Sequence, residues 1–223
     1  MQLYAGPLSL FSRKVEIALH EKALAFERVM VPFDQTAGYT PKHPFVLAAN
    51  PKRQVPVLID DGLTLFDSTV ILEYLEEAYP VSALYPSGAA ERARCRLLEL
   101  FADEILLPAV RDLMYRTEPA DANPERQRAR EAAGHRAEVA IRDHYGTLER
   151  RLGDRAHFCA NVSVADIALF MTVLFSLRLR GPGLDDHPAL ARWYGHVGAR
   201  PAFRRIADEV AAADRELAPR AET

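Results

Sequence analysis

Strand-like patterns occur only before residue 67 of this 223-residue chain, and every pattern after residue 89 is helical. Short apolar and β-branched runs between turn residues predict strands, whereas apolar residues at helical spacing predict helices. The predicted strands are 2–5, 28–31, 55–59 and 63–66, and the predicted helices among them are 12–20, 45–49 and 68–78. Any fold of this chain must accommodate a strand, a helix and a strand, then a loop, two strands and a helix.

That order resembles a thioredoxin-like domain, which we assign to residues 1–80. Residues 81–88 contain a proline and several small residues, which is typical of an interdomain linker. The fold class we predict is therefore α+β, a thioredoxin-like N-terminal domain (βαβ-ββα) followed by an all-α helical-bundle C-terminal domain, residues 89–223. The predicted helices of the second domain are 89–115, with a kink or interruption at Pro108, 125–152, 164–177, 189–197 and 202–217.

Composition excludes several classes of function. A net charge of −3 and a pI near 6.2 leave no basic excess for a nucleic-acid partner. The longest apolar run, residues 164–175, contains Asp166 and is too short for a membrane span, and no signal-like segment opens the chain. We therefore expect a cytoplasmic protein with no membrane partner. Cys95 and Cys159 lie far apart in sequence, which favours two buried thiols over a disulfide or a metal site.

Ser9 is the first candidate catalytic residue. It lies just before the first predicted helix, and Ser12 follows it at the spacing of the cysteines in a C-x-x-C motif. A serine cannot exchange disulfides, but its hydroxyl can donate to the sulfur of a bound thiol beside the free N–H groups of a helix start. The alternative is that Ser9 or Ser12 only caps the helix, because serine is a preferred N-cap residue.

Two later segments could bind a peptide-like ligand. If the bond before Pro56 is cis, the backbone of Val55 turns outward and can pair with the main chain of a ligand. Asp67 and Ser68 lie where a strand meets a helix, so backbone N–H groups and the hydroxyl could bind a carboxylate while Asp67 accepts from an ammonium. A γ-glutamyl group carries both of these charges on one carbon.

Taken together, these segments resemble the cytosolic glutathione transferase family over essentially the whole chain. The resemblance implies that glutathione is a co-substrate, that no metal is needed and that the protein is a homodimer. Ser9 would then activate the sulfur of glutathione. The other residues that the resemblance assigns to glutathione are Val55 and Pro56 for the cysteinyl backbone, Asp67 and Ser68 for the γ-glutamyl end, Gln54 for the backbone or glycyl end, and Lys42 for the glycyl carboxylate, with His43 and Lys52 as rivals.

The helical region carries a structural motif and a weaker substrate motif. Ser163 and Asp166 have the spacing of an N-cap and its capping-box partner, as in the helix-nucleating motif of the family. Leu107 and Arg111 recur at helical spacing, and Tyr115 follows one turn later, so the family resemblance makes them a second-substrate wall. Core packing or a solvated helix face explains these three residues equally well.

The leading hypothesis is an enzyme that ionises the glutathione thiol and delivers it to an electrophilic carbon in an apolar pocket. Conjugation, isomerisation and dehalogenation share this first step. The segment Leu8-Ser9-Leu10 lacks the Ser-Ser-Cys signature of the maleylacetoacetate isomerase branch, and it lacks the cysteine that thiol exchange requires.

Two alternatives are not enzymes. Residues 3–7 and 73–77 also resemble the stringent starvation protein A group, a regulator that binds RNA polymerase. That group carries a Pro-His-Pro element where this chain has Pro80-Val81-Ser82-Ala83. The other alternative is a glutathione-binding carrier with little turnover.

Overall fold

The computed structural model describes residues 1–35 and 37–217, which form two compact units. Unit 1 contains residues 1–84 and the last described helix, and unit 2 contains residues 85–200. The elements of unit 1 are β1 (Gln2–Ala5), α1 (Leu10–Glu21), β2 (Glu27–Met30), α2 (Pro44–Ala49), β3 (Val57–Asp60), β4 (Leu63–Phe66), α3 (Ser68–Ala78) and α9 (Pro201–Leu217). Those of unit 2 are α4 (Ala89–Leu100), the π-helical η1 (Phe101–Leu106), α5 (Leu107–Arg111), the 3-10 helix η2 (Met114–Thr117), α6 (Pro124–Leu152), α7 (Val164–Arg178) and α8 (Pro188–Gly198). The predicted fold class is confirmed, while residues 218–223 of the predicted second domain lie outside the described residues.

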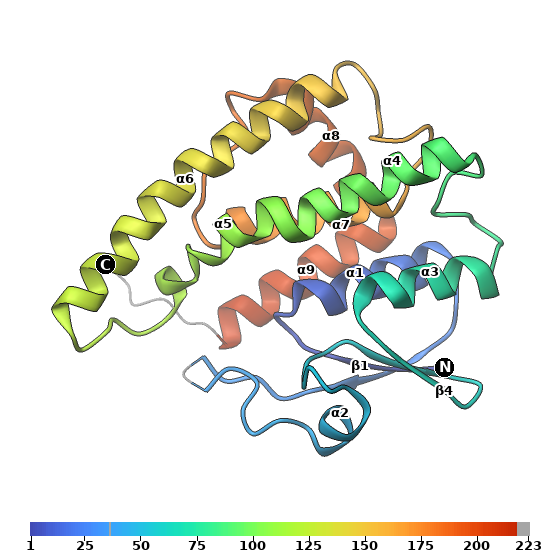
Figure 1. Ribbon diagram of the computed structural model, residues 1–223, viewed down its shortest axis with the longest axis horizontal. Coiled ribbons are helices and arrows are strands. Elements are labelled where there is room, and N and C mark those ends of the chain that lie inside the picture. Colours follow the sequence, from blue (N-terminus) through green and yellow to red (C-terminus); the bar gives the residue numbers. More distant parts are fainter. Residues whose placement is uncertain (36, 218–223) are drawn as a thin grey trace. The chain divides into compact units, whose positions relative to one another are not determined.

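Unit 1 is built on a four-stranded sheet with the order β2-β1-β3-β4. Strand β1 pairs with β2 in parallel and with β3 antiparallel, and β3 pairs antiparallel with β4. Helices α1, α3 and α9 lie on one side of this sheet and α2 on the other (Figure 1). The predicted strand 55–59 begins later, at Val57, because Pro56 has no N–H with which to start a ladder.

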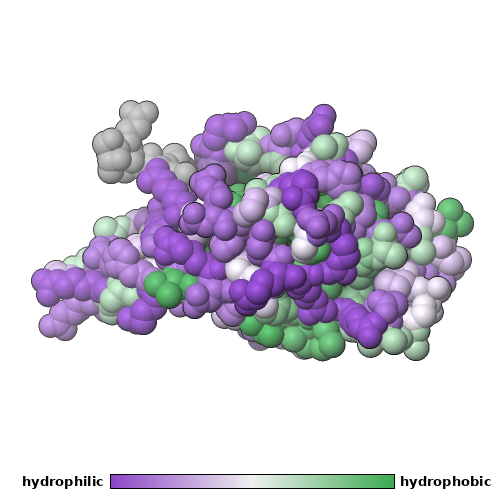
Figure 2. Space-filling view, turned by 90° about the horizontal axis from the view of Figure 1, so that it is seen from above, coloured by the Kyte–Doolittle hydropathy of each residue, from purple (hydrophilic) through white to green (hydrophobic). Residues whose placement is uncertain are grey.

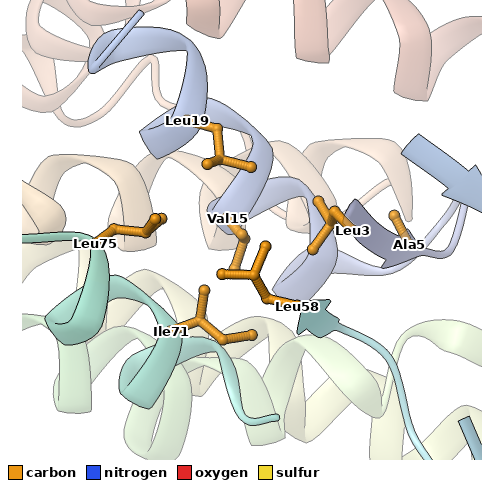
Figure 3. Close-up of a cluster of buried hydrophobic side chains, with 7 residues drawn as sticks. All are labelled: Leu3, Ala5, Val15, Leu19, Leu58, Ile71 and Leu75. Atoms are coloured by element: carbon orange, nitrogen blue, oxygen red, sulfur yellow. The ribbon is translucent and has the colours of Figure 1, made fainter. Parts of the chain in front are cut away.

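The core of unit 1 forms because successive residues of a strand point to opposite faces of the sheet. Leu58 faces the cluster between the sheet and helices α1 and α3, whereas Val57 packs on the other face with Val31 and Val46. Figure 3 shows the first cluster, whose buried members are Leu3, Ala5, Val15, Leu19, Leu58, Ile71 and Leu75. Each fully buried side chain of this size contributes about 1.5–3 kcal/mol, so this cluster holds α1 and its first turn rigidly on the sheet.

A buried ionic network fastens α1 to α9 inside unit 1. The Arg13 guanidinium, which is 2% exposed, lies 2.8 Å from Glu16 and 2.9 Å from Glu209 of α9. Arg28 of β2 also pairs with both carboxylates. Burial alone would raise the pKa of Glu209, but its hydrogen bonds with Arg28 and Arg205 outweigh burial and lower it. The Nε atom of Arg13 donates to the carbonyl of Pro7 at 3.2 Å, so the network also holds the loop that enters α1.

The interruption predicted at Pro108 is present in unit 2, as a change of helix type. The π-helical η1 precedes α5, and Pro108 lies in the first turn of α5. Proline has no N–H to donate, and its ring excludes the carbonyl four residues earlier, so the regular α-helical hydrogen bonds cannot continue through it. A wider π turn moves that carbonyl away while the chain direction is kept.

The remaining helices of unit 2 follow the predicted pattern. Asn123 caps α6 by accepting from the N–H groups of Glu125 and Arg126, and Gly153 at φ +56° ends it. Helix α7 is apolar on almost every side and contributes more buried residues than any other described helix of unit 2. Hydrophilic residues dominate the face in Figure 2, with smaller apolar groups between them. No helix within residues 1–35 and 37–217 is both long enough and apolar enough to cross a bilayer.

Candidate functional site

The register of the sheet brings the predicted glutathione segments to one end of unit 1. Tyr4 lies opposite Val57, which in turn lies opposite Phe66. Strands β1 and β4 run toward this end and β3 starts from it, so residues 6–9, 55–56 and 67–68 all adjoin it. Motifs that are separate in the sequence are therefore neighbours in space.

Ser9 caps α1 with its oxygen and keeps its hydroxyl hydrogen free. Its Oγ accepts from the Ser12 N–H at 3.3 Å and from the Ser12 hydroxyl at 3.1 Å, while Ser12 Oγ accepts from the Gly6 N–H at 3.2 Å. Ser12 is fully buried, whereas Ser9 is partly exposed. The Ser9 hydroxyl donates to no other described residue. The cap and the sulfur-donor roles are thus compatible, because they use different atoms of the same hydroxyl.

The loop before β3 presents a free backbone beside a cis bond. The Val55–Pro56 peptide bond is cis, as the peptide-binding hypothesis requires. The backbone N–H and C=O of Val55 bond to no other described residue, and Gln54 is exposed. Asn50, which is 2% exposed, supports this loop by donating to the Gln54 carbonyl at 2.6 Å and accepting from the Lys52 N–H at 2.8 Å. An extended ligand could pair with Val55 as an added strand.

Asn50→Ala is expected to lower the free energy of unfolding by about 1–3 kcal/mol, because it removes two hydrogen bonds, to the Gln54 carbonyl and from the Lys52 N–H, each worth about 0.5–1.5 kcal/mol. Urea denaturation followed by circular dichroism measures this change. Gln54→Ala is the matched control, since it removes an exposed side chain of the same loop and keeps the carbonyl that Asn50 binds. Equal unfolding midpoints for the two variants would contradict the supporting role of Asn50.

Asp67 lies at the junction of β4 and α3, as the sequence predicts. Its Oδ1 atom accepts from the Thr69 N–H at 3.1 Å and thereby caps α3. Its Oδ2 atom pairs with the ammonium of Lys52 at 2.9 Å. Ser68 is buried at the start of the helix, and its hydroxyl bonds to no other described residue. Asp67 also has a φ of +75°, a region that costs a non-glycine residue about 1–3 kcal/mol and that recurs at binding sites.

The charge of Asp67 persists well into the acid range. Burial raises its pKa, but the hydrogen bond and charge of Lys52, together with the N–H groups of Thr69 and Val70, lower it further than burial raises it. The resulting pKa is below the ordinary aspartate value. Because the pKa is depressed, the stabilisation from this carboxylate is present above the ordinary value and is lost only as the pH falls through the lowered one.

Tyr39 fixes the turn that leads to Ser9. Its hydroxyl accepts from the Leu8 N–H at 3.2 Å, and a Cβ atom on Gly6 would lie 2.4 Å from the same oxygen. Only glycine fits there without displacing the ring. The Lys42 ammonium lies 5.9 Å from the centre of the Tyr39 ring, while His43 caps α2 by accepting from the Phe45 N–H. Lys42 is thus close to the Ser9 turn, whereas Lys52 is paired with Asp67.

The predicted second-substrate residues occupy different environments within unit 2. Leu107 is 4% exposed and Arg111 is exposed. The Tyr115 ring packs on Gly134 of α6, where an added Cβ would lie 2.6 Å from it, and Arg116 and Arg130 lie over its faces. Leu107 and Arg111 share α5, whereas Tyr115 lies in the 3-10 helix η2, so the even helical spacing of the three residues ends before Tyr115. Their role toward a second substrate stays a prediction.

Sequence reasoning missed the residues that support this site. Tyr39 and Asn50 carry no motif of their own, although an Asn-Pro step is a typical loop signal that marked Asn50. The pairing of Lys52 with Asp67 joins residues that are adjacent only after the hairpin forms. No local pattern could have revealed that contact.

The comparisons with known proteins agree with this architecture. Residues 3–86 match the family model described as glutathione S-transferase, N-terminal domain, and residues 123–196 match glutathione S-transferase, C-terminal domain. A maleylacetoacetate isomerase from Pseudomonas aeruginosa is 31% identical over 92% of this chain and 94% of its own length. A stringent starvation protein A homolog from Coxiella burnetii is 40% identical, but that match spans 44% of each chain.

Solved structures show the same fold over the whole chain. A sphingomonad glutathione S-transferase complexed with glutathione superposes with a TM-score of 0.74 at 29% identity, covering 95% of this chain and 99% of its own. Both halves of the chain match their respective family models, and a relative matches over nearly its full length. The chain therefore belongs to the glutathione S-transferase family.

Proposed function

We propose that this protein is a glutathione transferase in which Ser9 stabilises the thiolate of bound glutathione for attack on an electrophilic, apolar second substrate. The observation that carries the proposal is the Ser9 hydroxyl, whose oxygen is engaged as a cap while its hydrogen has no acceptor among the described residues. Ser12 cannot take this role, because it is buried and its hydroxyl donates to Ser9. A relative of the same fold is complexed with glutathione, which supports this ligand.

Glutathione would lie along the end of the sheet where the site segments meet. Val55 would pair with the cysteinyl backbone beside Pro56, and Gln54 would contact the backbone or the glycyl end. Asp67 and Ser68 would hold the γ-glutamyl end, with the ligand ammonium replacing that of Lys52. This exchange costs little, because the Lys52 side chain is 61% exposed and an exposed ion pair contributes about 0–1 kcal/mol.

Lys42 would bind the glycyl carboxylate, because its ammonium lies over the Tyr39 ring beside the Ser9 turn, whereas Lys52 lies next to Asp67 at the γ-glutamyl end. For the second substrate, Leu107, Arg111 and Tyr115 stay the proposed contacts.

We also infer a homodimer, which the exposed Leu97 and Leu100 of α4 support. Light scattering of the full chain tests the dimer, and a monomer mass at micromolar concentration would contradict it.

The magnitudes fit this role for Ser9. A free thiol with a pKa of about 8.5 is only a few per cent ionised at neutral pH, and lowering it by about two units requires roughly 2.7 kcal/mol. A hydrogen bond to a charged acceptor contributes about 1.5–3 kcal/mol, and the N-terminus of α1 adds a partial positive charge. The thiol proton leaves to solvent, the sulfur forms a bond to carbon, and a leaving group departs or the adduct rearranges. Conjugation, dehalogenation and isomerisation are the outcomes that this step permits.

Titration calorimetry with glutathione, followed by assays with an aryl halide, tests the proposal. We expect saturable heat in the micromolar to millimolar range and release of halide that requires both substrates. Heat without turnover of any electrophile would favour a carrier. The absence of heat at millimolar glutathione would overturn the proposal.

Asp67→Asn is expected to raise the KM for glutathione about 10- to 100-fold with little change in kcat, because a hydrogen bond to a charged group is worth about 1.5–3 kcal/mol. Steady-state kinetics at varied glutathione concentration measure the effect. Asp61→Asn, in the exposed hairpin turn of the same unit, is the matched control and should behave as the unmodified protein. An unchanged KM in Asp67→Asn would contradict the γ-glutamyl assignment.

The second candidate function is a regulator related to stringent starvation protein A, which the 40% identity to the Coxiella burnetii homolog favours. That match covers less than half of either chain, and the chain retains Ser9 with its free donor. A protein that binds RNA polymerase and shows no heat with glutathione would establish the regulator. Specific retention on immobilised glutathione would count against it.

A further inference from the structure

The peptide group between Pro7 and Leu8, just before Ser9, is held from both of its ends. Its carbonyl accepts from Nε of Arg13 at 3.2 Å, and its N–H donates to the hydroxyl of Tyr39 at 3.2 Å. A trans peptide group is a rigid plane whose C=O and N–H point in opposite directions. Hydrogen bonds at both ends therefore fix the orientation of this group within unit 1.

The turn leaves little freedom between that peptide group and the Ser9 hydroxyl. The N–H of Ser9 donates to the Gly6 carbonyl at 3.2 Å, so the next peptide group is held as well. Leu8 lies between the two peptide groups and is only 8% exposed. The Oγ atom of Ser9 then accepts from the N–H and the hydroxyl of Ser12. The direction of the Ser9 hydroxyl therefore depends on the peptide group that precedes Leu8.

Arg13 is the fixed end of this arrangement. The residue is 2% exposed, and its Nη1 atom lies 2.8 Å from a Glu16 oxygen and 2.9 Å from a Glu209 oxygen. Glu16 belongs to α1 and Glu209 to α9, and both helices pack within unit 1. The guanidinium that binds the Pro7 carbonyl is thus anchored to two helices.

Tyr39 holds the other end from the loop after β2. Its ring packs edge-on against Phe33, with ring centres 4.9 Å apart. A Cβ atom on Gly6 would lie 2.6 Å from two carbons of the Tyr39 ring, so the ring lies directly on the Gly6 backbone. The hydroxyl that accepts from the Leu8 N–H is therefore carried by a packed ring.

We propose that Tyr39 is a positioning residue for catalysis, whose hydroxyl holds the Pro7–Leu8 peptide group against Arg13 and so directs the Ser9 hydroxyl toward the glutathione sulfur. This inference rests on the proposed function of Ser9. A hydrogen bond weakens as its angle departs from linear, so a misdirected Ser9 stabilises the thiolate less although it keeps its hydroxyl. The competing explanations are that Tyr39 binds glutathione directly or that it only stabilises its loop.

Tyr39→Phe tests the proposal, because it removes the hydroxyl and keeps the ring that lies beside the Lys42 ammonium. We expect the thiol pKa of bound glutathione to rise by about half a unit to one unit, and kcat on the acid limb of the pH profile to fall about 3- to 10-fold. The KM for glutathione should change by less than about twofold. A raised KM with an unchanged thiol pKa would show direct binding and overturn the proposal.

The same substitution in a Ser9→Ala background separates positioning from general damage to the loop. A variant without the Ser9 hydroxyl has no donor to direct, so adding Tyr39→Phe should raise the thiol pKa no further. Ultraviolet absorbance of the thiolate in the binary complex measures all of these values. Equal shifts in the two backgrounds would overturn the proposal.

Tyr74→Phe is the matched control, because it also removes one tyrosine hydroxyl from unit 1. The Tyr74 hydroxyl donates to Asp60 at 2.8 Å, and its loss should leave the thiol pKa unchanged. A shift as large as that of Tyr39→Phe would overturn the proposal. If Ser9→Ala itself leaves the thiol pKa unchanged, the proposed function fails and the role of Tyr39 with it. If Ser9→Ala raises the pKa and Tyr39→Phe does not, only the role of Tyr39 fails.

Discussion

Ser9→Ala should lower kcat/KM for an aryl halide about 10- to 100-fold, because it removes a hydrogen bond to a thiolate worth about 1.5–3 kcal/mol. The thiol pKa of bound glutathione should rise by about one to two units, since each unit corresponds to about 1.4 kcal/mol. The acid limb of the pH-rate profile should therefore move toward alkaline pH. Thiolate absorbance of the binary complex in the ultraviolet measures the same shift without turnover.

Two variants separate the role of Ser9 in catalysis from its role as a cap. Ser9→Thr keeps a hydroxyl and a cap, and it should retain most of the thiolate absorbance. Ser12→Ala leaves the Gly6 N–H without its acceptor and should lower the free energy of unfolding more than it moves the thiol pKa. If Ser12→Ala abolished the thiolate signal and Ser9→Ala retained it, the catalytic assignment would be wrong.

Asp166→Ala has the largest effect on stability that we expect. Asp166 is fully buried and accepts from the Phe158 N–H at 3.1 Å, from the N–H and hydroxyl of Ser163 at 3.0 Å each, and from the Trp193 Nε1 at 2.9 Å. Truncation leaves these buried donors unpaired, which costs about 3–5 kcal/mol. The apparent melting temperature should fall on the order of 10 °C. Differential scanning calorimetry of the full chain measures this loss.

Two further substitutions test whether Asp166 stabilises the protein as a hydrogen-bond acceptor or through its charge. Burial raises the pKa of Asp166 in spite of its hydrogen bonds, so a neutral acceptor should replace it in part. Asp166→Asn is therefore expected to lose less stability than Asp166→Ala. Asp143→Ala, on the exposed face of α6, should leave the melting temperature unchanged. Equal losses for all of these variants would contradict the acceptor role.

Much of the fold follows from patterns that are local in the chain. Strand β1, strand β4 and helix α3 have the predicted limits, because apolar alternation, the Gly62 turn and the Asp67 cap act on residues a few positions apart. The capping box of Ser163 and Asp166 is likewise confirmed. Pro108 was predicted to interrupt a helix, but a π-helical segment before it could not be predicted. The helix type of that segment depends on how the neighbouring turns pack.

The candidate site was predictable in its segments and not in its contacts. Ser9 and Asp67 were singled out from the sequence because each lies at the start of a predicted helix, where free N–H groups favour a bound anion. The pairing of Lys52 with Asp67 was missed, because an ion pair depends on where a hairpin brings its members. Tyr39, which holds the Leu8 N–H, was missed for the same reason.

The amino-acid sequence by itself determined the order of strands and helices, the caps of α1, α3 and α7, and the site segments. These depend on backbone preferences and on hydrogen bonds between near neighbours. Only the tertiary structure decided that Arg13 and Glu209 neutralise each other, that Lys52 pairs with Asp67, and that Asp166 accepts from Trp193. Contacts between distant residues form only when the whole core packs, and the energy of a buried charge or thiol depends on which partners that packing brings to it.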